Sequence, residues 1–266
     1  MLNFRNTNII FILLLIVLIV VQYDQGFDVS WFIALLLFYT AVLFYGSFYI
    51  RSNFFVKTFF KGDPAKKQIA LSFDDGPSTT YTPEILNVLK EQSVKATFFT
   101  IGENIEEHPD IFKQILEEGH LVGNHSFYHS NWFDLQTSKS MIEEMQETHE
   151  LVYQLSGKHL NWFRPPYGVI NPQVKKALRK MKYQPIGWSV RSMDTVARDR
   201  AKLLNRLKQS LRPGAVILFH DTQQVTLEVL PDYIQFVKEQ GYEIVHLDKL
   251  LHLQAYRSDS PSAQKT

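Results

Sequence analysis

The sequence predicts an α/β fold in which a parallel sheet is covered by helices, preceded by an apolar helical hairpin. Three observations support this. From Gln68 onward, short apolar segments alternate with amphipathic ones, as expected for strands and helices in turn. The polar motifs fall where the predicted strands end, which is where βα loops build barrel active sites. Two long apolar runs precede the first strand.

The apolar runs cover residues 8–21 and 27–50. A membrane-spanning helix needs roughly 20 such residues. The second run meets this length, whereas the first is short and needs Gln22 and Tyr23 as interfacial flanks. The alternative for the first run is a signal-peptide core, although no small-residue cleavage site follows it. We therefore expect residues 1–51 to form a membrane anchor with two transmembrane helices in the cell membrane.

Charged residues flank these runs unevenly. Arg5 precedes the first run, Asp24 and Asp28 lie between the two, and basic residues follow the second. The positive-inside rule then places both termini in the cytoplasm. Residues 52–67 are interpreted as a basic linker, which carries Lys57, Lys61, Lys66 and Lys67.

The predicted catalytic domain covers residues 68–255, and residues 256–266 (YRSDSPSAQKT) are expected to form a disordered tail. Strands are expected at 68–73, 96–101, 121–124, 162–164, 184–190, 215–219 and 243–246. Helices are expected at 82–92, 108–118, 138–155, 172–181, 197–211 and 227–240. The formal net charge of +1 gives no reason to expect nucleic acid as a partner, and the absence of cysteine excludes disulfides and thiolate metal sites. The oligomeric state is not indicated.

Asp74 and Asp75 stand side by side at the end of the first predicted strand, in the segment FDDGP. The Gly-Pro turn that follows can present both carboxylates to one cavity. Two carboxylates in one pocket repel each other and raise one pKa unless their roles are divided. A metal ion bound by one of them removes this conflict. The alternative is a polar turn without chemistry.

His125 and His129 follow the third strand in the segment NHSFYH. Imidazoles four residues apart on one helical turn can converge on a metal, although a surface pair of this kind is often incidental. One acid and two imidazoles are the minimum set that holds a divalent metal and leaves positions open for water and substrate. The combination predicts metal-assisted hydrolysis.

Two further motifs carry candidate catalytic groups. In FRPPYG, the prolines stiffen a loop that can hold an amide N–H against an oxyanion, and Arg164 can fix a carboxylate. In LFHD, His220 ends a buried strand and can protonate a leaving group. The alternatives are a stiff connector and a core histidine.

Together these motifs resemble the polysaccharide deacetylase family, carbohydrate esterase family four, from Gln68 to Leu251. The resemblance implies a distorted (β/α)7 barrel and a divalent metal held by Asp75, His125 and His129. Zinc is the metal expected first, with cobalt, nickel and manganese as alternatives. The resemblance also implies Asp74 as general base, Arg164 as its partner, His220 as general acid and the Tyr167 backbone N–H as an oxyanion donor.

The fourth motif departs from the family pattern. Where the family usually has an acid that assists the catalytic histidine and the motif arginine, this chain has Arg191. An arginine close to His220 would lower the imidazole pKa. Asp194 or Asp221 can supply the missing carboxylate, and the sequence does not distinguish between them.

The expected function is removal of N-acetyl groups from an amino-sugar glycan, of peptidoglycan or chitin type, by a membrane-tethered enzyme. O-deacetylation of an acetylated glycan is one alternative. A catalytically silent glycan-binding membrane protein is another, and Arg191 favours it. Family members mostly act on cell-surface polymers, which conflicts with a cytoplasmic domain. A cytoplasmic domain would favour a lipid-linked or nucleotide-linked precursor.

Overall fold

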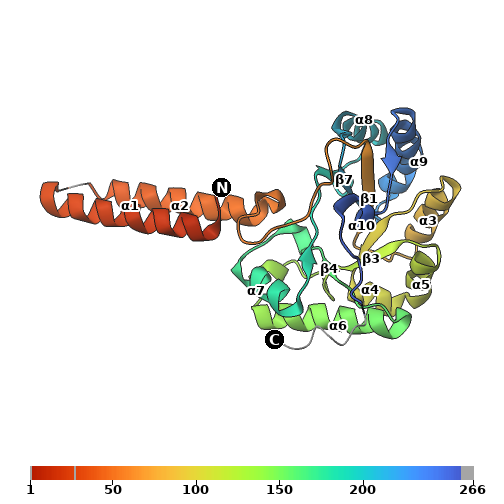
Figure 1. The fold of residues 1–266 in the computed structure, drawn as a ribbon, viewed down its shortest axis with the longest axis horizontal. Coiled ribbons are helices and arrows are strands. Elements are labelled where there is room, and N and C mark those ends of the chain that lie inside the picture. Colours follow the sequence, from red (N-terminus) through yellow and green to blue (C-terminus); the bar gives the residue numbers. More distant parts are fainter. Residues whose placement is uncertain (1, 27, 259–266) are drawn as a thin grey trace.

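The computed structural model describes residues 2–26 and 28–258. It has two parts, a helical hairpin formed by the N-terminal apolar segments and an α/β domain from which the hairpin projects (Figure 1). The hairpin consists of α1 (Phe4–Gln25) and α2 (Ser30–Phe48). A 3-10 turn, η1 (Ile50–Ser52), leads from α2 into the domain.

Contacts along the hairpin join the two helices. The Tyr39 hydroxyl donates to Asn8 Oδ1 at 2.6 Å, and the Tyr39 ring stacks on Phe11 at 4.1 Å between centroids. Most of the large apolar side chains of both helices point outward. By length and composition both helices are apolar enough to cross a membrane.

The domain is built on a curled, entirely parallel sheet in the order β5-β4-β3-β2-β1-β7-β6, with β8 paired to β1 outside this path. The predicted barrel-type α/β architecture is confirmed, with eight strands among the described residues in place of the seven expected. The strands are β1 (Gln68–Asp74), β2 (Thr97–Thr100), β3 (Leu121–Asn124), β4 (Trp162–Phe163), β5 (Gln184–Pro185), β6 (Val190–Arg191), β7 (Val216–His220) and β8 (Glu243–Ile244).

Helices cover the outside of this sheet (Figure 1). Their apolar faces and the strand residues form the core, in which Phe73, Phe98 and Phe219 stack in a row across β2, β1 and β7. The helices are α3 (Thr82–Glu91), α4 (Gly102–Glu107), α5 (Pro109–Glu117), α6 (Ser138–Ser156), α7 (Pro172–Met181), α8 (Arg200–Ser210), α9 (Gln224–Glu239) and α10 (Leu247–Leu251), with 3-10 turns η2 (Phe133–Leu135) and η3 (Pro166–Gly168).

The single strand expected at 184–190 is wrong, because the chain there forms two strands on opposite edges of the sheet. β5 pairs with β4, and β6 pairs with β7. Between them the carbonyls of Ile186 and Gly187 accept hydrogen bonds from the Arg164 side chain, and the Gly187 N–H donates to the Phe59 carbonyl. A buried side chain and the linker thus satisfy backbone groups that a strand neighbour would otherwise satisfy.

Both segments that flank the predicted domain pack against it. Phe54 and Phe55 of the linker are buried, and Phe59 bridges to Ile186. The tail was expected to be disordered from residue 256, and this start is too early. The Tyr256 hydroxyl accepts a hydrogen bond from the Val122 N–H at 3.0 Å, so Tyr256 is fixed to the domain. Residues 259–266 of the predicted tail lie outside the described residues.

Candidate metal centre and active site

The candidate site lies at the carboxyl ends of the central strands. Asp74 is the last residue of β1, and its register partner on β7 is His220. The next residue, Asp75, has a φ of 76°, a left-handed conformation that is uncommon for a residue with a side chain. This turn brings both carboxylates to the same cavity, as the sequence predicted, although successive side chains of a strand point to opposite faces.

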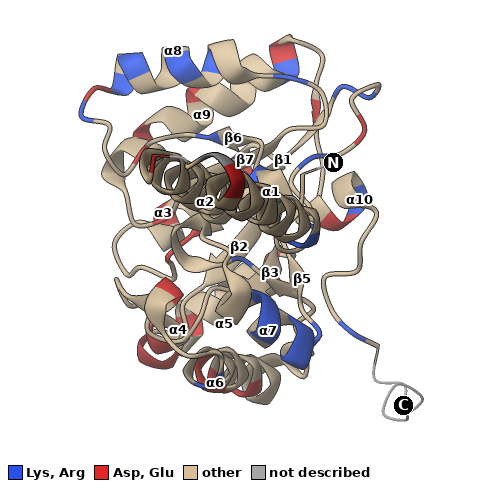
Figure 2. Ribbon diagram, turned by 90° about the vertical axis from the view of Figure 1, so that its left-hand side faces the viewer, with Lys and Arg blue, Asp and Glu red and all other residues tan. Residues whose placement is uncertain are grey.

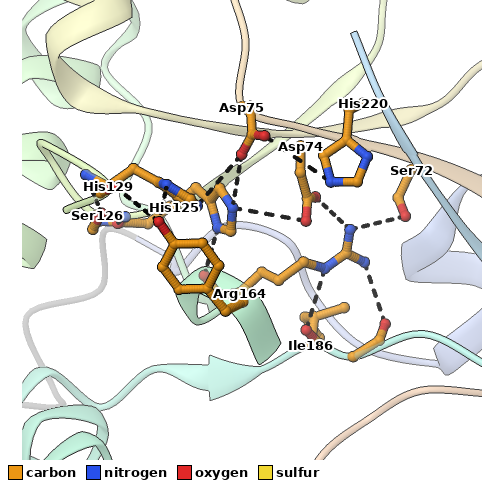
Figure 3. Close-up of polar contacts among 12 residues, drawn as sticks. Ser72, Asp74, Asp75, His125, Ser126, His129, Arg164, Ile186 and His220 are labelled. Atoms are coloured by element: carbon orange, nitrogen blue, oxygen red, sulfur yellow. Dashed lines mark hydrogen bonds and ion pairs between the residues drawn. The ribbon is translucent and has the colours of Figure 1, made fainter. Parts of the chain in front are cut away.

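Asp75, His125 and His129 converge on one point (Figure 3). Asp75 Oδ1 lies 3.3 Å from His125 Nε2 and 3.5 Å from His129 Nε2. One ligand atom from each of the three residues lies within 4.8 Å of the other two. Among the described residues this is the one group of three or more such side chains that could hold a metal ion.

The two imidazoles do not share a helical turn, so this part of the sequence interpretation is wrong. They lie in a loop that follows β3, and both Ser126 and His129 in this loop have a positive φ, of 67° and 48°. Ser126 Oγ accepts from the His129 N–H at 3.0 Å, and the Thr148 hydroxyl of α6 donates to the Ser126 carbonyl at 2.9 Å. These bonds hold the loop in a conformation that brings the imidazoles together.

The donor set fits a divalent cation. His125 Nδ1 lies 2.7 Å from the Arg164 carbonyl, so an N–H there leaves Nε2 facing Asp75 at 3.3 Å, an arrangement typical of metal-bound histidine. Burial lowers the pKa of His125, but the Asp74 charge and the contact with Asp75 raise it, with a net increase, so a bound metal would take the place of the Nε2 proton. Burial, followed by the charge of His125, lowers the pKa of His129 to about 4. Burial raises the pKa of Asp75, but the hydrogen bond from His125 and the charges of the nearby histidines lower it further, with a net decrease. A neutral His129 imidazole and an ionised Asp75 carboxylate are the forms that bind metal.

Asp74 is held by a different partner. Its Oδ1 accepts a hydrogen bond from Arg164 Nη1 at 2.6 Å, within an ion pair that is almost completely buried. Arg164 also donates to Ser72 Oγ, and its guanidinium lies 3.9 Å from the centroid of the Phe99 ring. Asp74 Oδ2 faces His125 Nε2 at 3.7 Å. One carboxylate oxygen is therefore fixed by Arg164, while the other faces the candidate metal ligands (Figure 3).

His220 lies on the other side of Asp75, with its Nε2 4.0 Å from Asp75 Oδ2. Its Nδ1 lies 2.7 Å from Asp194 Oδ1, and its backbone N–H donates to Asp194 Oδ2 at 2.7 Å. Burial lowers the pKa of His220, but the hydrogen bond to Asp194 and its charge raise the pKa to about 9. Of the two acids that the sequence left open, Asp194 is the partner, because Asp221 instead accepts from the Thr82 hydroxyl.

Arg191 does not act on His220 in the way its position in the sequence suggested. Its side chain is exposed and lines the wall of the cavity. The pKa of His220 is raised, not lowered, because the hydrogen bond to Asp194 and the Asp194 charge outweigh the effect of burial. The departure from the family pattern therefore leaves His220 with a carboxylate partner.

Tyr167 borders the cavity with a φ of 59°, so it shares the left-handed conformation of Asp75 and His129. Strained residues of this kind cluster at functional sites. Its hydroxyl donates to Asn131 Oδ1 at 2.9 Å and lies 3.5 Å from His129 Nδ1. Among the hydrogen bonds of the described residues none uses the Tyr167 backbone N–H.

The cavity above these groups has a volume of about 210 Å³. Its floor is formed by the polar residues already described, and Trp188 and Leu218 add apolar walls. A mostly apolar wall with a few convergent polar groups is typical of a small-molecule site.

Some residues that shape the site were not identified from the sequence. Ser72 supports Arg164, and the buried Glu144 accepts from the N–H groups of Phe127 and Tyr128 in the histidine loop. Ser72 precedes the two aspartates by two and three residues, a strand spacing that places Ser72 and Asp74 on one face. This spacing could have identified Ser72 as a site residue from the sequence alone. Glu144 lies in an amphipathic helix, where an acid normally faces solvent. The residues next to it in the sequence do not indicate that it is buried.

Comparisons with known proteins agree with this fold. The polysaccharide deacetylase family model matches residues 61–186. The chain is 34% identical over 197 residues, 73% of this chain and 74% of the relative, to peptidoglycan-N-acetylmuramic acid deacetylase PdaA of Bacillus subtilis. It is 36% identical to peptidoglycan-N-acetylglucosamine deacetylase PgdA of Listeria monocytogenes, of which it spans only 39%.

Two solved structures extend the comparison. The Bc1960 peptidoglycan N-acetylglucosamine deacetylase superposes with a TM-score of 0.70 at 34% identity, covering 74% of this chain and 94% of that one. BA3943 of Bacillus anthracis, described as a family pseudoenzyme, superposes with a TM-score of 0.68 at 32% identity, covering 72% and 68%. The fold, the converging Asp-His-His group and these identities lead to one conclusion: the chain belongs to the polysaccharide deacetylase family of hydrolases.

Proposed function

We propose that this chain is a membrane-tethered, metal-dependent N-deacetylase of an amino-sugar glycan. The observation that carries the proposal is the convergence of Asp75, His125 and His129 between a base candidate, Asp74, and an acid candidate, His220. The relatives named above as peptidoglycan deacetylases support an N-acetylated glycan as the substrate.

Asp75, His125 and His129 are the residues that would hold the metal, with zinc as the first candidate. A metal bound there would polarise the acetyl carbonyl and lower the pKa of a bound water. The proton transfers and the remaining stabilisation of the oxyanion would be carried out by residues of the chain itself. Asp74 Oδ2 would accept the proton of the attacking water, while the hydrogen bond from Arg164 to Oδ1 keeps the carboxylate oriented.

Residues on the other side of the cavity would act on the leaving group. His220, whose Nδ1 is paired with Asp194, would donate a proton from Nε2 to the departing amine. The Tyr167 backbone N–H would donate to the oxyanion as the acetyl carbon becomes tetrahedral. The walls formed by Trp188 and Leu218 would exclude water from one side of the sugar ring.

The test uses the full chain in detergent, with acetate release from N-acetylglucosamine oligomers as the readout. EDTA should abolish release, and Zn²⁺ or Co²⁺ should restore it. Turnover that survives metal removal would contradict the proposal. Acetylated xylan, assayed in parallel, separates N-deacetylation from O-deacetylation, because a higher kcat/KM on xylan would favour the esterase.

The catalytically silent alternative rests on the similarity to BA3943. It predicts glycan binding without acetate release under any metal. Arg191 was the sequence feature that favoured it, and Arg191→Asp would then be expected to increase activity. An active wild-type chain would exclude this alternative.

A further inference from the structure

A second cavity lies beside the candidate active site and is lined by arginines. Its volume is about 250 Å³, and four arginines line it: Arg51, Arg191, Arg206 and Arg212. They come from four places in the chain. Arg51 is in η1 just after the hairpin, Arg191 ends β6, and the other two lie in α8 and in the segment between α8 and β7.

The backbone around Ser189 organises two of these side chains. The Ser189 carbonyl accepts hydrogen bonds from Arg51 Nη1, at 3.2 Å, and from Arg212 Nη2. Two guanidinium groups are thus drawn to one oxygen although they repel each other. Within residues 2–26 and 28–258, no ion pair joins a carboxylate to any of the four arginines.

Four positive charges around one cavity without an anionic partner favour a ligand of high negative charge. A phosphate monoester carries roughly −1.5 to −2 charges at neutral pH. Guanidinium groups bind phosphate oxygens through paired, directional hydrogen bonds. The cavity therefore has the chemistry of a phosphate or diphosphate site.

The arginine cavity is a neighbour of the candidate active site, because the two cavities share lining residues. Trp188 and Arg191 line both cavities. A ligand that extends past Trp188 and Arg191 would place an anionic group among the arginines and an acetamido group at the candidate metal ligands.

The arginine cavity also lies at the base of the hairpin. Arg51 follows the end of α2 at Phe48 by three residues, and its guanidinium lies 4.8 Å from the centroid of the Tyr49 ring. If α2 spans a bilayer, Arg51 lies at the level where lipid phosphates begin.

We propose that the cavity formed by Arg51, Arg191, Arg206 and Arg212 binds a phosphate or diphosphate group carried by the amino-sugar substrate, so that the chain deacetylates a phosphate-linked sugar. The proposal rests on the deacetylase function proposed above and narrows its substrate class. The same chemistry occurs in a sugar linked to a polyprenyl lipid and in a nucleotide-linked sugar, and the hairpin favours the lipid.

The first experiment measures binding without catalysis. Full-length protein in phosphatidylcholine nanodiscs, kept in EDTA, is titrated with polyprenyl diphosphate and with polyprenol. The diphosphate should bind and the alcohol should not. In the double variant Arg206→Gln/Arg212→Gln the Kd for the diphosphate should rise at least tenfold. Lys176→Gln/Lys180→Gln removes the same charge from the exposed face of α7 and should leave the Kd within twofold.

The second experiment measures turnover on three substrates with the metal present: N-acetylglucosamine linked to polyprenyl diphosphate, UDP-N-acetylglucosamine and chitotetraose. A preference for either phosphate-linked sugar that the arginine double variant removes would support the proposal and identify the carrier. Equal kcat/KM on all three substrates, or an equal loss on all three in the variant, would overturn it. Arginine-dependent binding of phosphatidylglycerol without any substrate preference would also overturn it, since the cavity would then bind membrane headgroups only.

The two proposals fail in different ways. Diphosphate binding that depends on the arginines, with no acetate release from any substrate, would refute the deacetylase and retain the phosphate site. Acetate release with no role for the arginines would retain the deacetylase and refute the phosphate site.

Discussion

The hairpin and the catalytic domain place polar and apolar groups in opposite ways. In the hairpin, large apolar side chains face outward, with Leu13 57% and Phe38 66% exposed. In the domain, charged side chains are enclosed, with Arg164 0% and Asp74 3% exposed. The hairpin therefore presents an apolar surface, whereas the domain needs each buried charge to keep its partner.

The largest effect is expected at the base candidate. Asp74→Asn keeps the shape of the side chain but removes its ability to accept a proton, so kcat should fall by roughly 10²–10⁴-fold. Metal content, measured by mass spectrometry on the same sample, should stay unchanged. The matched variant Asp75→Asn should instead lose the metal. Metal loss in Asp74→Asn would place Asp74 among the ligands and contradict the assignment.

Breaking the buried ion pair should strongly destabilise the domain. Arg164→Met leaves the Asp74 carboxylate buried without its partner, which typically costs about 3–5 kcal/mol. Thermal unfolding followed by tryptophan fluorescence measures this, with the exposed Arg179→Met as control. The cost should shrink when Asp74→Asn is already present. An equal cost in both backgrounds would mean that packing of Arg164, not the charge pair, explains the loss.

A smaller effect is expected from the partner of the acid candidate. Asp194→Asn should lower kcat on the order of 10²-fold, because His220 loses the group that orients it. The pKa of His220, raised to about 9, should fall. If His220 acts in its protonated form, as proposed, activity is lost as the pH rises through this pKa, and the alkaline limb of the kcat profile should move to lower pH.

A control for this shift is Thr226→Val, which removes a hydrogen bond to Asp194 but keeps the carboxylate. Its alkaline limb should move less than that of Asp194→Asn. An unchanged profile in Asp194→Asn would show that His220 is not the group that titrates.

Acid sensitivity should depend on His120, a buried histidine outside the site. Burial, followed by the charge of Lys95, lowers its pKa to about 3. The unfolded chain binds a proton near pH 6.5, before the folded chain does. Stability from His120 is therefore complete above pH 6.5 and is lost as the pH falls toward 3. His120→Gln should flatten the decrease in melting temperature between pH 7 and 5, and an unchanged slope would contradict this.

The smallest effect is expected in the hairpin. Tyr39→Phe removes the hydrogen bond to Asn8, and side-chain hydrogen bonds between membrane helices average about 0.6 kcal/mol. Unfolding of the full chain by SDS in bicelles can measure this difference. Tyr45→Phe, which removes a hydroxyl from the same helix, is the control. Equal losses in both variants would mean that the Asn8 contact adds nothing.

The sequence was most informative where chemistry and strand position coincide. Asp74, Asp75 and His220 follow apolar strands, and parallel strands bring their carboxyl ends to one edge, so their proximity could be predicted. The conformation of the histidine loop could not be predicted, because it depends on bonds from Thr148 in a distant helix. The break between β5 and β6 was missed for a similar reason, since Arg164 satisfies the backbone there.

The carboxylate partner of His220 could not be predicted from the sequence either. Asp194 and Asp221 were equally acceptable in the sequence, because neither position indicates the direction of its side chain. In the fold, Met193 takes a φ of 70° and Asp194 accepts from both the Thr226 hydroxyl and the His220 backbone N–H. Contacts between residues far apart in the sequence therefore determine that Asp194, and not Asp221, pairs with His220.

Both ends of the hairpin join the domain through backbone hydrogen bonds. The Phe4 N–H donates to the Phe54 carbonyl at 3.0 Å, and the Ile170 N–H donates to the Ser47 carbonyl at 2.9 Å (Figure 2 views the domain along the hairpin). These hydrogen bonds hold the hairpin directly against the domain, without a free linker between them. If the hairpin lies in a bilayer, the active site stays close to the membrane surface, and glycans near that surface are the ones within its reach.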